Sequence, residues 1–292
     1  MNSGVPARCS YSLNILNSSK IVAQNLAMNI FQRLKRNHVH YTLKKHRIAY
    51  PLWRQTTEKL PLLNHLNSRE KAQLRILSSL FLHKKTMTGV QGVTVTDEIA
   101  ILVATQACLP VLKLGLDYYR GWIEVIIYPA AFQVTHENID ENGLSSNDTL
   151  NLSGESWLRG PVILSWEDVE ADLEMLHQGR NVIIHEFAHK IDMLNGRANG
   201  MPPLHPQMTP HKWTNALSEA YEKLRNQISH HHRAAINPYA ATAPAEFFAV
   251  VSEYFFTAPK LLQQYCPDVH TQLVQFYRQD PCLCRPNVCS TN

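Results

Sequence analysis

The stretch NVIIHEFAHKIDMLNG, residues 181–196, contains two histidines four positions apart, with a glutamate directly after the first. Its other residues are mostly apolar, as in a helix that packs on a protein core. On such a helix His185 and His189 share one face, about 6 Å apart along the axis. Glu186 is rotated by about 100° from His185. The stretch is therefore either a metal site or three polar residues on the exposed face of an amphipathic helix.

The chemistry of these three residue types favours the metal site. Two imidazole Nε2 atoms on one helix face can bind a single zinc ion at about 2.0–2.1 Å each. Glu186 can then reach a zinc-bound water, accept its proton and pass that proton to a leaving amine. This is the H-E-x-x-H arrangement of zinc peptidases. Burying two histidines and an acid in so apolar a helix would also be costly without partners.

A third ligand must come from elsewhere in the chain. A metzincin would continue with glycine three residues after His189 and histidine six residues after it. The residues at those positions are Asp192 and Asn195, which excludes that class. The other common third ligand is a glutamate on a later helix. Glu246 fits, because it begins an otherwise apolar helix, and Glu253 lies two turns further on, where we expect it to support the ligands from behind.

Tyr239 lies seven residues before Glu246. A phenol at this place can donate a hydrogen bond to the oxyanion of a tetrahedral intermediate. The alternative, a tyrosine packed in a loop, is equally compatible with the sequence. For the histidine run 230–232 we expect a polar loop, with a metal-binding run as the alternative. For His205 and His211 we expect surface positions in a loop, although they could also line a cleft.

The composition indicates a globular protein with an uneven charge distribution. Of 292 residues, 45% are hydrophobic and 18% are charged, which suits a chain that buries a core. Residues 1–50 contain eight Lys and Arg residues and no Asp or Glu, whereas the rest contains 20 basic and 24 acidic residues. A nucleic-acid-binding body would carry positive charge on its folded face, so we expect no direct nucleic-acid partner. We expect residues 1–50 to be a poorly ordered extension. Two interpretations of its first 27 residues stay open: a physiological start at Met28, which we favour, and a segment that loosely resembles a transit peptide.

Hydropathy and cysteine usage predict a cytoplasmic protein without a membrane span. The longest apolar stretch, residues 99–112, has 14 residues, whereas a bilayer span needs about 20. Two cysteines, Cys9 and Cys108, are isolated, which argues against a disulfide framework. Four more crowd the C-terminus: Cys266, Cys282, Cys284 and Cys289. A metal clip there is the alternative, but the spacing of Cys282 and Cys284 lacks the two-residue gap of a zinc knuckle.

Local patterns predict an α+β architecture. We expect strands at residues 88–96, 122–128 and 161–166, and a loop or ragged hairpin at 135–156. We expect helices at residues 67–86, with Asn67 or Ser68 as N-cap, at 97–119 with an interruption at Pro110, at 181–195 closed by Gly196, at 213–228, at 244–256 with Thr242 as N-cap, and at 259–281. This order, with helices before, between and after the strands, is typical of a small mixed sheet packed on helices.

Several separated motifs together resemble the Mlc titration factor A (MtfA) family of bacterial zinc peptidases. They are HEFAHKID, NPYAATAPAEFFAVVSEYFF, QACLPVLKLGLDYY, EVIIYPAAF and SGESWLRGPVILSW, and they occur in the family's order. The likeness covers roughly residues 55–280. It predicts a peptidase domain at 51–280, followed by a tail at 281–292.

The resemblance implies a fold and a set of site residues. The family's zincin-like fold is similar to the catalytic domain of anthrax lethal factor. Carried over to this chain, the zinc ligands are His185, His189 and Glu246, with one zinc ion per chain. The catalytic base is Glu186, and Tyr239 stabilises the transition state. All five positions match in residue type and order.

The resemblance also implies an activity and a partner. The expected enzyme is an aminopeptidase-like gluzincin that hydrolyses peptide substrates. The expected partner is the glucose repressor Mlc, whose binding releases genes of the glucose phosphotransferase system. The alternative is a regulatory binding protein with a vestigial or structural zinc site. Such a protein would need neither Glu186 nor Tyr239, and a structural zinc site would be closed by four protein ligands.

One strand is predicted to take part in substrate binding. Zinc peptidases commonly hold an extended substrate against the edge of a sheet. Residues 161–166 precede the HExxH helix closely in the chain, so we expect this strand at the sheet's edge beside that helix.

Overall fold

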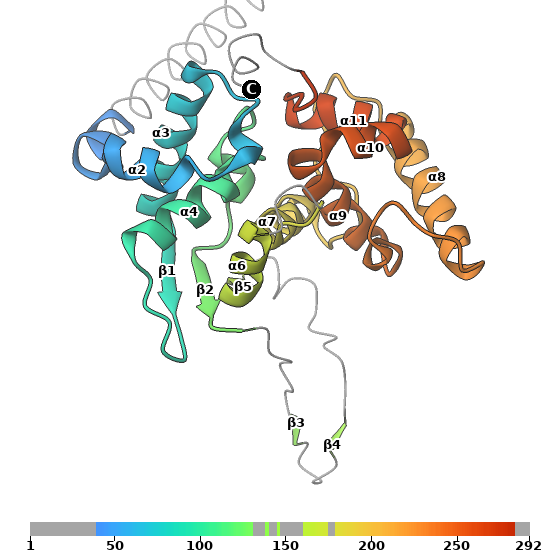
Figure 1. Cartoon of the computed structure of the whole chain (residues 1–292), viewed down its shortest axis with the longest axis horizontal. Coiled ribbons are helices and arrows are strands. Elements are labelled where there is room, and N and C mark those ends of the chain that lie inside the picture. Colours follow the sequence, from blue (N-terminus) through green and yellow to red (C-terminus); the bar gives the residue numbers. More distant parts are fainter. Residues whose placement is uncertain (1–38, 131–137, 140–144, 147–159, 175–178, 284–292) are drawn as a thin grey trace, which may run out of the picture. The chain divides into compact units, whose positions relative to one another are not determined.

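A computed structural model of the chain describes residues 39–130, 138–139, 145–146, 160–174 and 179–283 (Figure 1). The chain divides into two compact units, Met1–Arg47 and Ile48–Asn292. In the first unit, residues 39–46 form a helix. The elements described below all belong to the second unit.

The predicted ends of the peptidase domain stay predictions. The basic extension at 1–50, its start at Met28 and the tail at 281–292 fall mostly on residues 1–38 and 284–292, outside the described residues. Among the residues that are described, none of the helices combines the length and the apolarity that a bilayer crossing requires.

The second unit opens with helices that precede the first strand of the sheet in the chain. They are α2 (Tyr50–Thr57), the short 3-10 helix η1 (Pro61–Leu63) and α3 (Ser68–Lys84). The N-cap of α3 is Asn67, whose side chain accepts from the Glu70 backbone N–H at 2.8 Å, while the Glu70 carboxylate accepts from the Asn67 N–H at 3.1 Å. This capping box satisfies two backbone donors at once. The prediction of a helix that starts here is confirmed.

A small parallel sheet lies beside these helices. Its strands are β1 (Thr86–Gly89), β2 (Glu124–Tyr128) and β5 (Val162–Ser165), in the order β1-β2-β5. Both pairings are parallel, so the prediction of a mixed sheet is wrong for the described strands. Parallel neighbours need a crossover, and α4 (Asp97–Cys108) lies in the connection from β1 to β2. The strand β5 is at the edge of this sheet, as expected.

The first strand lies earlier in the chain than predicted. We expected residues 88–96, but β1 ends at Gly89. Two residues further on the chain turns, because Gln91 and Gly92 have positive φ angles of 52° and 90°. The alternating pattern after this turn therefore belongs to the approach to α4 and not to a strand.

The predicted loop or hairpin at 135–156 lies largely outside the described residues. Its two described pieces are β3 (Asn138–Ile139) and β4 (Ser145–Ser146). They pair antiparallel to each other, as the strands of a hairpin do.

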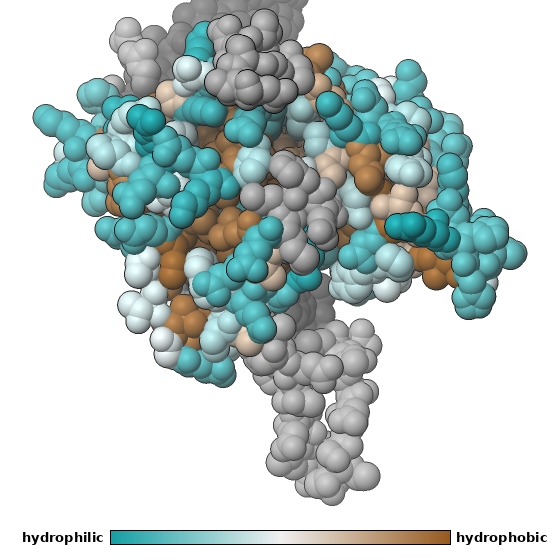
Figure 2. Space-filling view, in the orientation of Figure 1, coloured by the Kyte–Doolittle hydropathy of each residue, from teal (hydrophilic) through white to brown (hydrophobic). Residues whose placement is uncertain are grey.

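The central helix α7 (Val182–Asp192) packs against α9, α4 and β5 (Figure 1). Its Phe187 enters an aromatic cluster with Phe81, Tyr119 and Trp122, at ring-centroid distances of 5.7, 5.1 and 5.7 Å. Such contacts anchor the inner face of α7 in the core and orient its opposite face outward. Figure 2 shows hydrophilic residues over most of the visible described surface, with smaller hydrophobic patches between them.

The chain continues from α7 into a helical region. A short helix, α6 (Trp166–Glu174), precedes α7, and η3 (Met193–Asn195) follows it and ends at Gly196. The later elements are α8 (Pro210–Ser229), η4 (Pro238–Ala241), α9 (Pro244–Thr257), α10 (Pro259–Tyr265) and α11 (Pro267–Tyr277). All ten residues of α9 from Phe247 to Phe256 are buried. This burial makes α9 a rigid partner for α7.

Two local predictions in this region are wrong. Thr242 is not the N-cap of α9, because its hydroxyl donates to the Tyr239 carbonyl at 2.7 Å and closes η4, so that Ala243 precedes the helix. The single helix expected at 259–281 is two helices, which meet at Cys266. Pro267 lacks an N–H and clashes with a preceding helical turn, so α10 must end before it.

Candidate metal centre

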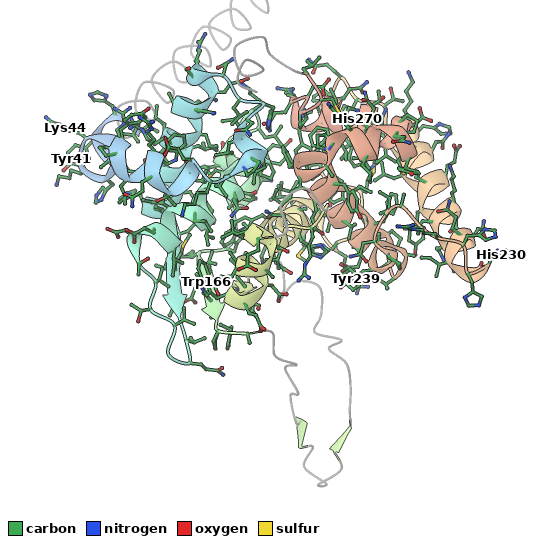
Figure 3. The ribbon with its side chains drawn as sticks, viewed as in Figure 1. Tyr41, Lys44, Trp166, His230, Tyr239 and His270 are labelled. Atoms are coloured by element: carbon green, nitrogen blue, oxygen red, sulfur yellow. The ribbon has the colours of Figure 1, made fainter. Side chains whose placement is uncertain are left out.

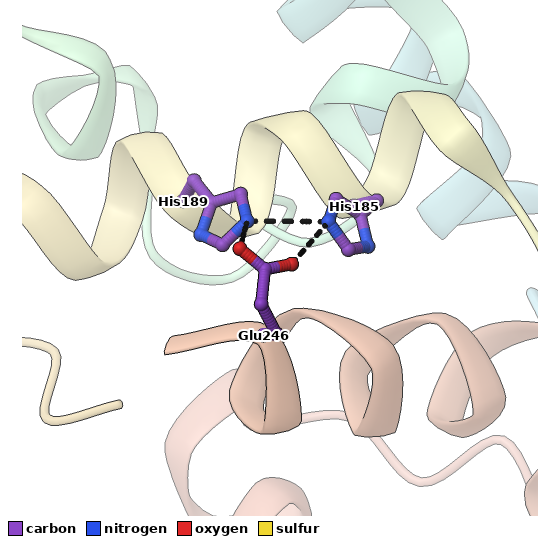
Figure 4. A group of neighbouring side chains, drawn as sticks. All are labelled: His185, His189 and Glu246. Carbon is purple, nitrogen blue, oxygen red and sulfur yellow. Dashed lines mark hydrogen bonds and ion pairs between the residues drawn. The ribbon is translucent and has the colours of Figure 1, made fainter. Parts of the chain in front are cut away.

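Three side chains from two helices converge beside the core (Figure 4). His185 and His189 lie on the outward face of α7, and Glu246 lies in the first turn of α9. The two imidazole Nε2 atoms are 3.2 Å apart. The Glu246 carboxylate lies 3.1 Å from His185 Nε2 through Oε2 and 3.4 Å from His189 Nε2 through Oε1. The structure thus brings together the three ligands that the sequence predicted.

The spacing of these atoms fits a zinc ion. Bonds of about 2.0–2.2 Å in a tetrahedral site place neighbouring ligand atoms about 3.3–3.5 Å apart. The three observed separations lie within a few tenths of an ångström of that range. Two imidazoles and one carboxylate are also the protein ligands of catalytic zinc sites, which leave a fourth position open. The donor set therefore fits zinc in both number and type.

A chain of hydrogen bonds holds His185 from behind. Glu253 Oε1 lies 2.7 Å from His185 Nδ1, and Glu253 Oε2 accepts from the Asn181 backbone N–H at 2.5 Å. The Asn181 side-chain amide in turn donates to Gln106 Oε1 on α4 at 2.6 Å. With Nδ1 held by a carboxylate, the His185 ring is oriented and its Nε2 is more basic. This is the supporting place that the sequence predicted for Glu253.

The protonation of the group reflects its paired charges. Burial alone would lower the pKa of His185, but hydrogen bonds to Glu246 and Glu253 outweigh it and raise the pKa to about 10. Burial would likewise raise the pKa of Glu246, but the two histidines hold it well below its usual range. A metal ion in this place would therefore displace a proton from His185.

Glu186 shares a cavity with the three candidate ligands. The cavity has a volume of about 300 Å³, and its lining includes Glu186, Tyr239 and, from the edge strand region, Pro161 and Ile163. Burial raises the pKa of Glu186, although the neighbouring histidines oppose that shift. A carboxylate with a raised pKa is a better proton acceptor than an ordinary one, which suits a general base.

Tyr239 lies at the mouth of the same cavity and is labelled in Figure 3. It belongs to η4, which the Asn237 side chain caps by accepting from the Tyr239 backbone N–H at 3.0 Å. The Tyr239 ring centroid is 6.0 Å from that of His185, and 52% of the residue is exposed. Burial and the Glu246 charge raise the pKa of Tyr239 to about 12, so the phenol keeps its proton.

Asp192 anchors a turn beside the site, a role that its position in the sequence does not reveal. This buried carboxylate accepts from the Asn199 and Gly200 backbone N–H groups at 2.7 Å each. A Cβ at Gly200 would lie 2.7 Å from the Pro244 carbonyl oxygen, so this turn packs directly on the start of α9. Within the described part of the chain, Asp192 Oδ1 and His189 Nδ1 have no hydrogen-bond partner. The sequence contains one indication of this position: Asp192 is an acid three residues after His189, so the two side chains lie on the same face of the helix.

Lys190 is a second residue whose role the sequence does not reveal. Its Nζ donates to the Gly160 carbonyl at 2.9 Å and lies 5.7 Å from the Trp122 ring centroid. Because Gly160 precedes β5, this bond ties the edge strand to α7. Burial lowers the pKa of Lys190 to about 8.

The other clustered histidines lie outside this centre. His205 is buried, and its Nε2 lies 2.8 Å from the Phe276 carbonyl. His211 is exposed, as is the run 230–232 at the end of α8, which includes the labelled His230 in Figure 3. None of these residues lines the cavity that contains Glu186.

Comparison with known proteins places this geometry in a family. The model of the glucose-regulated metallo-peptidase M90 family matches residues 31–278, most of the chain. The match begins earlier than residue 55, where the resemblance in the sequence motifs began. It includes every residue of the metal centre.

Curated relatives agree with the family model. The Mlc titration factor A of Salmonella arizonae is 42% identical over 225 residues, which are 76% of this chain and 88% of that protein. The Klebsiella pneumoniae protein of the same name is 40% identical over 232 residues, or 78% of this chain and 86% of that protein. Identity at this level over most of both chains confirms the resemblance, and the chain belongs to the glucose-regulated metallo-peptidase M90 family.

Proposed function

We propose that this chain is a zinc-dependent, gluzincin-type peptidase with a zincin-like fold. His185, His189 and Glu246 would hold one zinc ion. When bound, zinc supplies a Lewis acid for the scissile carbonyl and lowers the pKa of a water molecule. The observation that carries the proposal is the convergence of three side chains, with 3.1–3.4 Å between their nitrogen and oxygen atoms, on a cavity that Glu186 and Tyr239 also line.

Glu186 would serve as the general base. Its carboxylate lines the cavity from the position next to His185, and burial raises its pKa, which makes it a better proton acceptor. It would take a proton from the attacking water and pass it to the leaving amine. Removing the carboxylate should therefore stop turnover without removing a zinc ligand.

Tyr239 would stabilise the transition state. Because its pKa is about 12, the phenol is protonated at neutral pH and can donate a hydrogen bond. Its exposed position at the cavity mouth lets it meet the oxyanion that develops on the substrate carbonyl. Since the side chain is half exposed, this contact would tighten only when a substrate fills the cavity.

The edge of the sheet would hold the substrate backbone. In the described part of the sheet, β5 pairs on one side only, and Ile163 of this strand lines the cavity. An extended peptide can add to such an edge through main-chain hydrogen bonds. The bond from Lys190 to Gly160 fixes the start of this strand relative to the metal ligands. The expected aminopeptidase-like preference rests on the family resemblance.

The test of this function combines zinc content with peptide hydrolysis. We expect about one catalytic zinc per chain in the wild type and in Glu186→Gln, and cleavage of aminoacyl reporter peptides by the wild type alone. The matched control is Glu170→Gln, which removes an exposed carboxylate of α6 and should retain activity. Equal activity of the wild type and Glu186→Gln would refute the assignment of Glu186 as the general base.

We also propose a regulatory partner in the cytoplasm. The relatives carry the name Mlc titration factor A, and we propose that this chain likewise binds Mlc. The cysteines Cys108, Cys266 and Cys282 are free thiols, which suits a reducing compartment. A binding role alone would not require Glu186 and Tyr239 at one cavity.

Purified Mlc provides the test of this partner. We expect the wild type and Glu186→Gln to bind it with the same affinity, because binding a protein surface does not need the catalytic carboxylate. A wild-type chain that fails to bind Mlc at micromolar concentration would remove this part of the proposal.

A further inference from the structure

A second group of ligand atoms lies at the end of α11. His270 is on that helix, and Asp280 and Cys282 are in the segment that follows it. One ligand atom from each residue lies within 4.8 Å of the other two. His270 Nε2 is 3.4 Å from Cys282 Sγ and 4.0 Å from Asp280 Oδ1.

The backbone after α11 brings these residues together. Arg278, the C-cap, adopts the left-handed conformation with φ 53°, which turns the chain back at the end of the helix. Gln279 then donates from Nε2 to the Leu109 carbonyl at 2.9 Å, which fastens the turn to the end of α4. Asp280 Oδ1 accepts from the Cys282 backbone N–H at 3.0 Å. The turn is thus held in a conformation that directs Asp280 and Cys282 toward His270.

We propose that His270, Asp280 and Cys282 form a second metal site that binds Zn²⁺. A tetrahedral site with zinc–sulfur and zinc–nitrogen bonds of ordinary length places these two atoms about 3.5 Å apart, close to the observed 3.4 Å. The carboxylate oxygen, at 4.0 Å, needs to approach by about half an ångström. Nitrogen, sulfur and oxygen donors together suit zinc better than magnesium or calcium, which prefer oxygen alone.

This site is separate from the catalytic centre. The His270 ring lies 5.6 Å from that of Phe255, near the end of α9, whereas Glu246 is in the first turn. Phe255 follows Glu246 by nine positions of helix, about 13 Å along the axis. The family match ends at residue 278, so it includes His270 but neither Asp280 nor Cys282.

Zinc at this place would act as a clip. It would join the helical His270 to the chain segment that leaves α11, and so fasten the end of the domain. Burial raises the pKa of the Cys282 thiol and lowers that of His270, so both are neutral in the absence of metal. On binding, the Cys282 S–H bond breaks, a sulfur–zinc bond forms and the proton goes to solvent.

Cobalt substitution tests the site, because only one of the two centres contains sulfur. A Co²⁺–thiolate bond gives an intense near-ultraviolet charge-transfer band that histidine and carboxylate ligands cannot give. We expect the full-length wild-type chain, titrated with Co²⁺ under reducing conditions, to develop this band. Cys282→Ser and His270→Gln should lose it. The matched control is Cys266→Ser, which changes a nearby cysteine outside the group and should retain the band.

Zinc content gives a second readout that does not depend on spectroscopy. We expect two zinc ions per wild-type chain and one per Cys282→Ser chain, with peptide hydrolysis unchanged in that variant. Absence of the cobalt band from the wild type, or its persistence in Cys282→Ser, would overturn the proposal. Because the band is independent of hydrolysis, either result leaves the proposed peptidase activity to be judged on its own test.

Discussion

The two groups of ligand atoms differ in how the fold holds them. In the proposed catalytic centre, Glu246 follows His189 by 57 residues, and the candidate ligands come from two helices that pack against each other. In the C-terminal group, Cys282 follows His270 by 12 residues, and two of the three ligands lie on a turn. The first group is therefore positioned by the core of the domain, whereas the second depends on local backbone at its end.

The support behind the ligands differs as well. His185 has the Glu253 carboxylate at its second nitrogen, and that carboxylate is fixed by the Asn181 backbone. In the part of the chain that the structure describes, the His270 ring packs on Phe255, and no carboxylate is bonded to its second nitrogen as Glu253 is to that of His185. When the ligands are already held in place, less free energy is needed to order them as the metal binds. We therefore expect the catalytic centre to bind zinc more tightly than the C-terminal group.

The largest expected effect comes from removing Glu246. In Glu246→Ala we expect zinc at the catalytic centre to be lost at micromolar concentration and hydrolysis to fall to the background rate. The cobalt–thiolate band of the C-terminal group should be unaffected. Asp280→Ala is the reciprocal control, in which hydrolysis should persist while the band weakens. Wild-type zinc affinity in Glu246→Ala would refute its assignment as third ligand.

The next effect separates transition-state binding from metal binding. In Tyr239→Phe the phenol donor is lost while every metal ligand remains, so we expect kcat to fall about 10²–10³-fold. KM and zinc content should stay as in the wild type. Tyr265→Phe is the control, because that tyrosine is exposed on α10 and lies outside the cavity. A Tyr239→Phe enzyme with unchanged kcat would make this residue an ordinary loop tyrosine.

A smaller effect tests the support behind His185. In Glu253→Gln the charge that orients the imidazole is removed, so we expect zinc affinity at the catalytic centre to fall about 10–100-fold. Competition with a chromogenic chelator measures this directly. Glu222→Gln on the exposed side of α8 should have no effect. If Glu253→Gln binds zinc as tightly as the wild type, the expected difference in zinc affinity between the two sites is not due to this carboxylate.

The smallest effect is a pH dependence of the zinc-free protein. Hydrogen bonds to Glu246 and Glu253, which outweigh burial, raise the pKa of His185 from its ordinary 6.5 to about 10. The stability from these pairs is therefore fully present below about pH 6.5 and is lost as the pH rises through about 10. We expect the urea midpoint of the zinc-stripped chain to fall over this range, and to fall less in Glu246→Gln. A midpoint that rises with pH would contradict the ion-pair account.

Much of the candidate metal centre could be predicted from local signals in the sequence. The spacing of His185 and His189 depends only on helical geometry, and Glu246 was recognisable as an acid in an apolar helix. The cap at Asn67 is local too. At Pro267 two signals in the sequence conflict. A proline ends the helix before it, but the apolar pattern continues on both sides and favours a single helix.

Features that depend on distant contacts could not be predicted. Whether the strands pair parallel or antiparallel follows from how the connections cross the sheet, and no local pattern records that. The role of Asp192 requires the turn at 199–200 to pack on the start of α9. The group around His270 requires the left-handed turn at Arg278, a conformation that arginine rarely adopts.

Anomalous diffraction at the zinc absorption edge tests the central claim most directly, on crystals grown with zinc. The account predicts a strong peak within about 2.0–2.2 Å of His185 Nε2, His189 Nε2 and a Glu246 oxygen, with Glu186 facing it but not bound to it. A second, less occupied peak should lie among His270, Asp280 and Cys282. Absence of density between α7 and α9, or a peak bound by Glu186 in place of Glu246, would contradict the account.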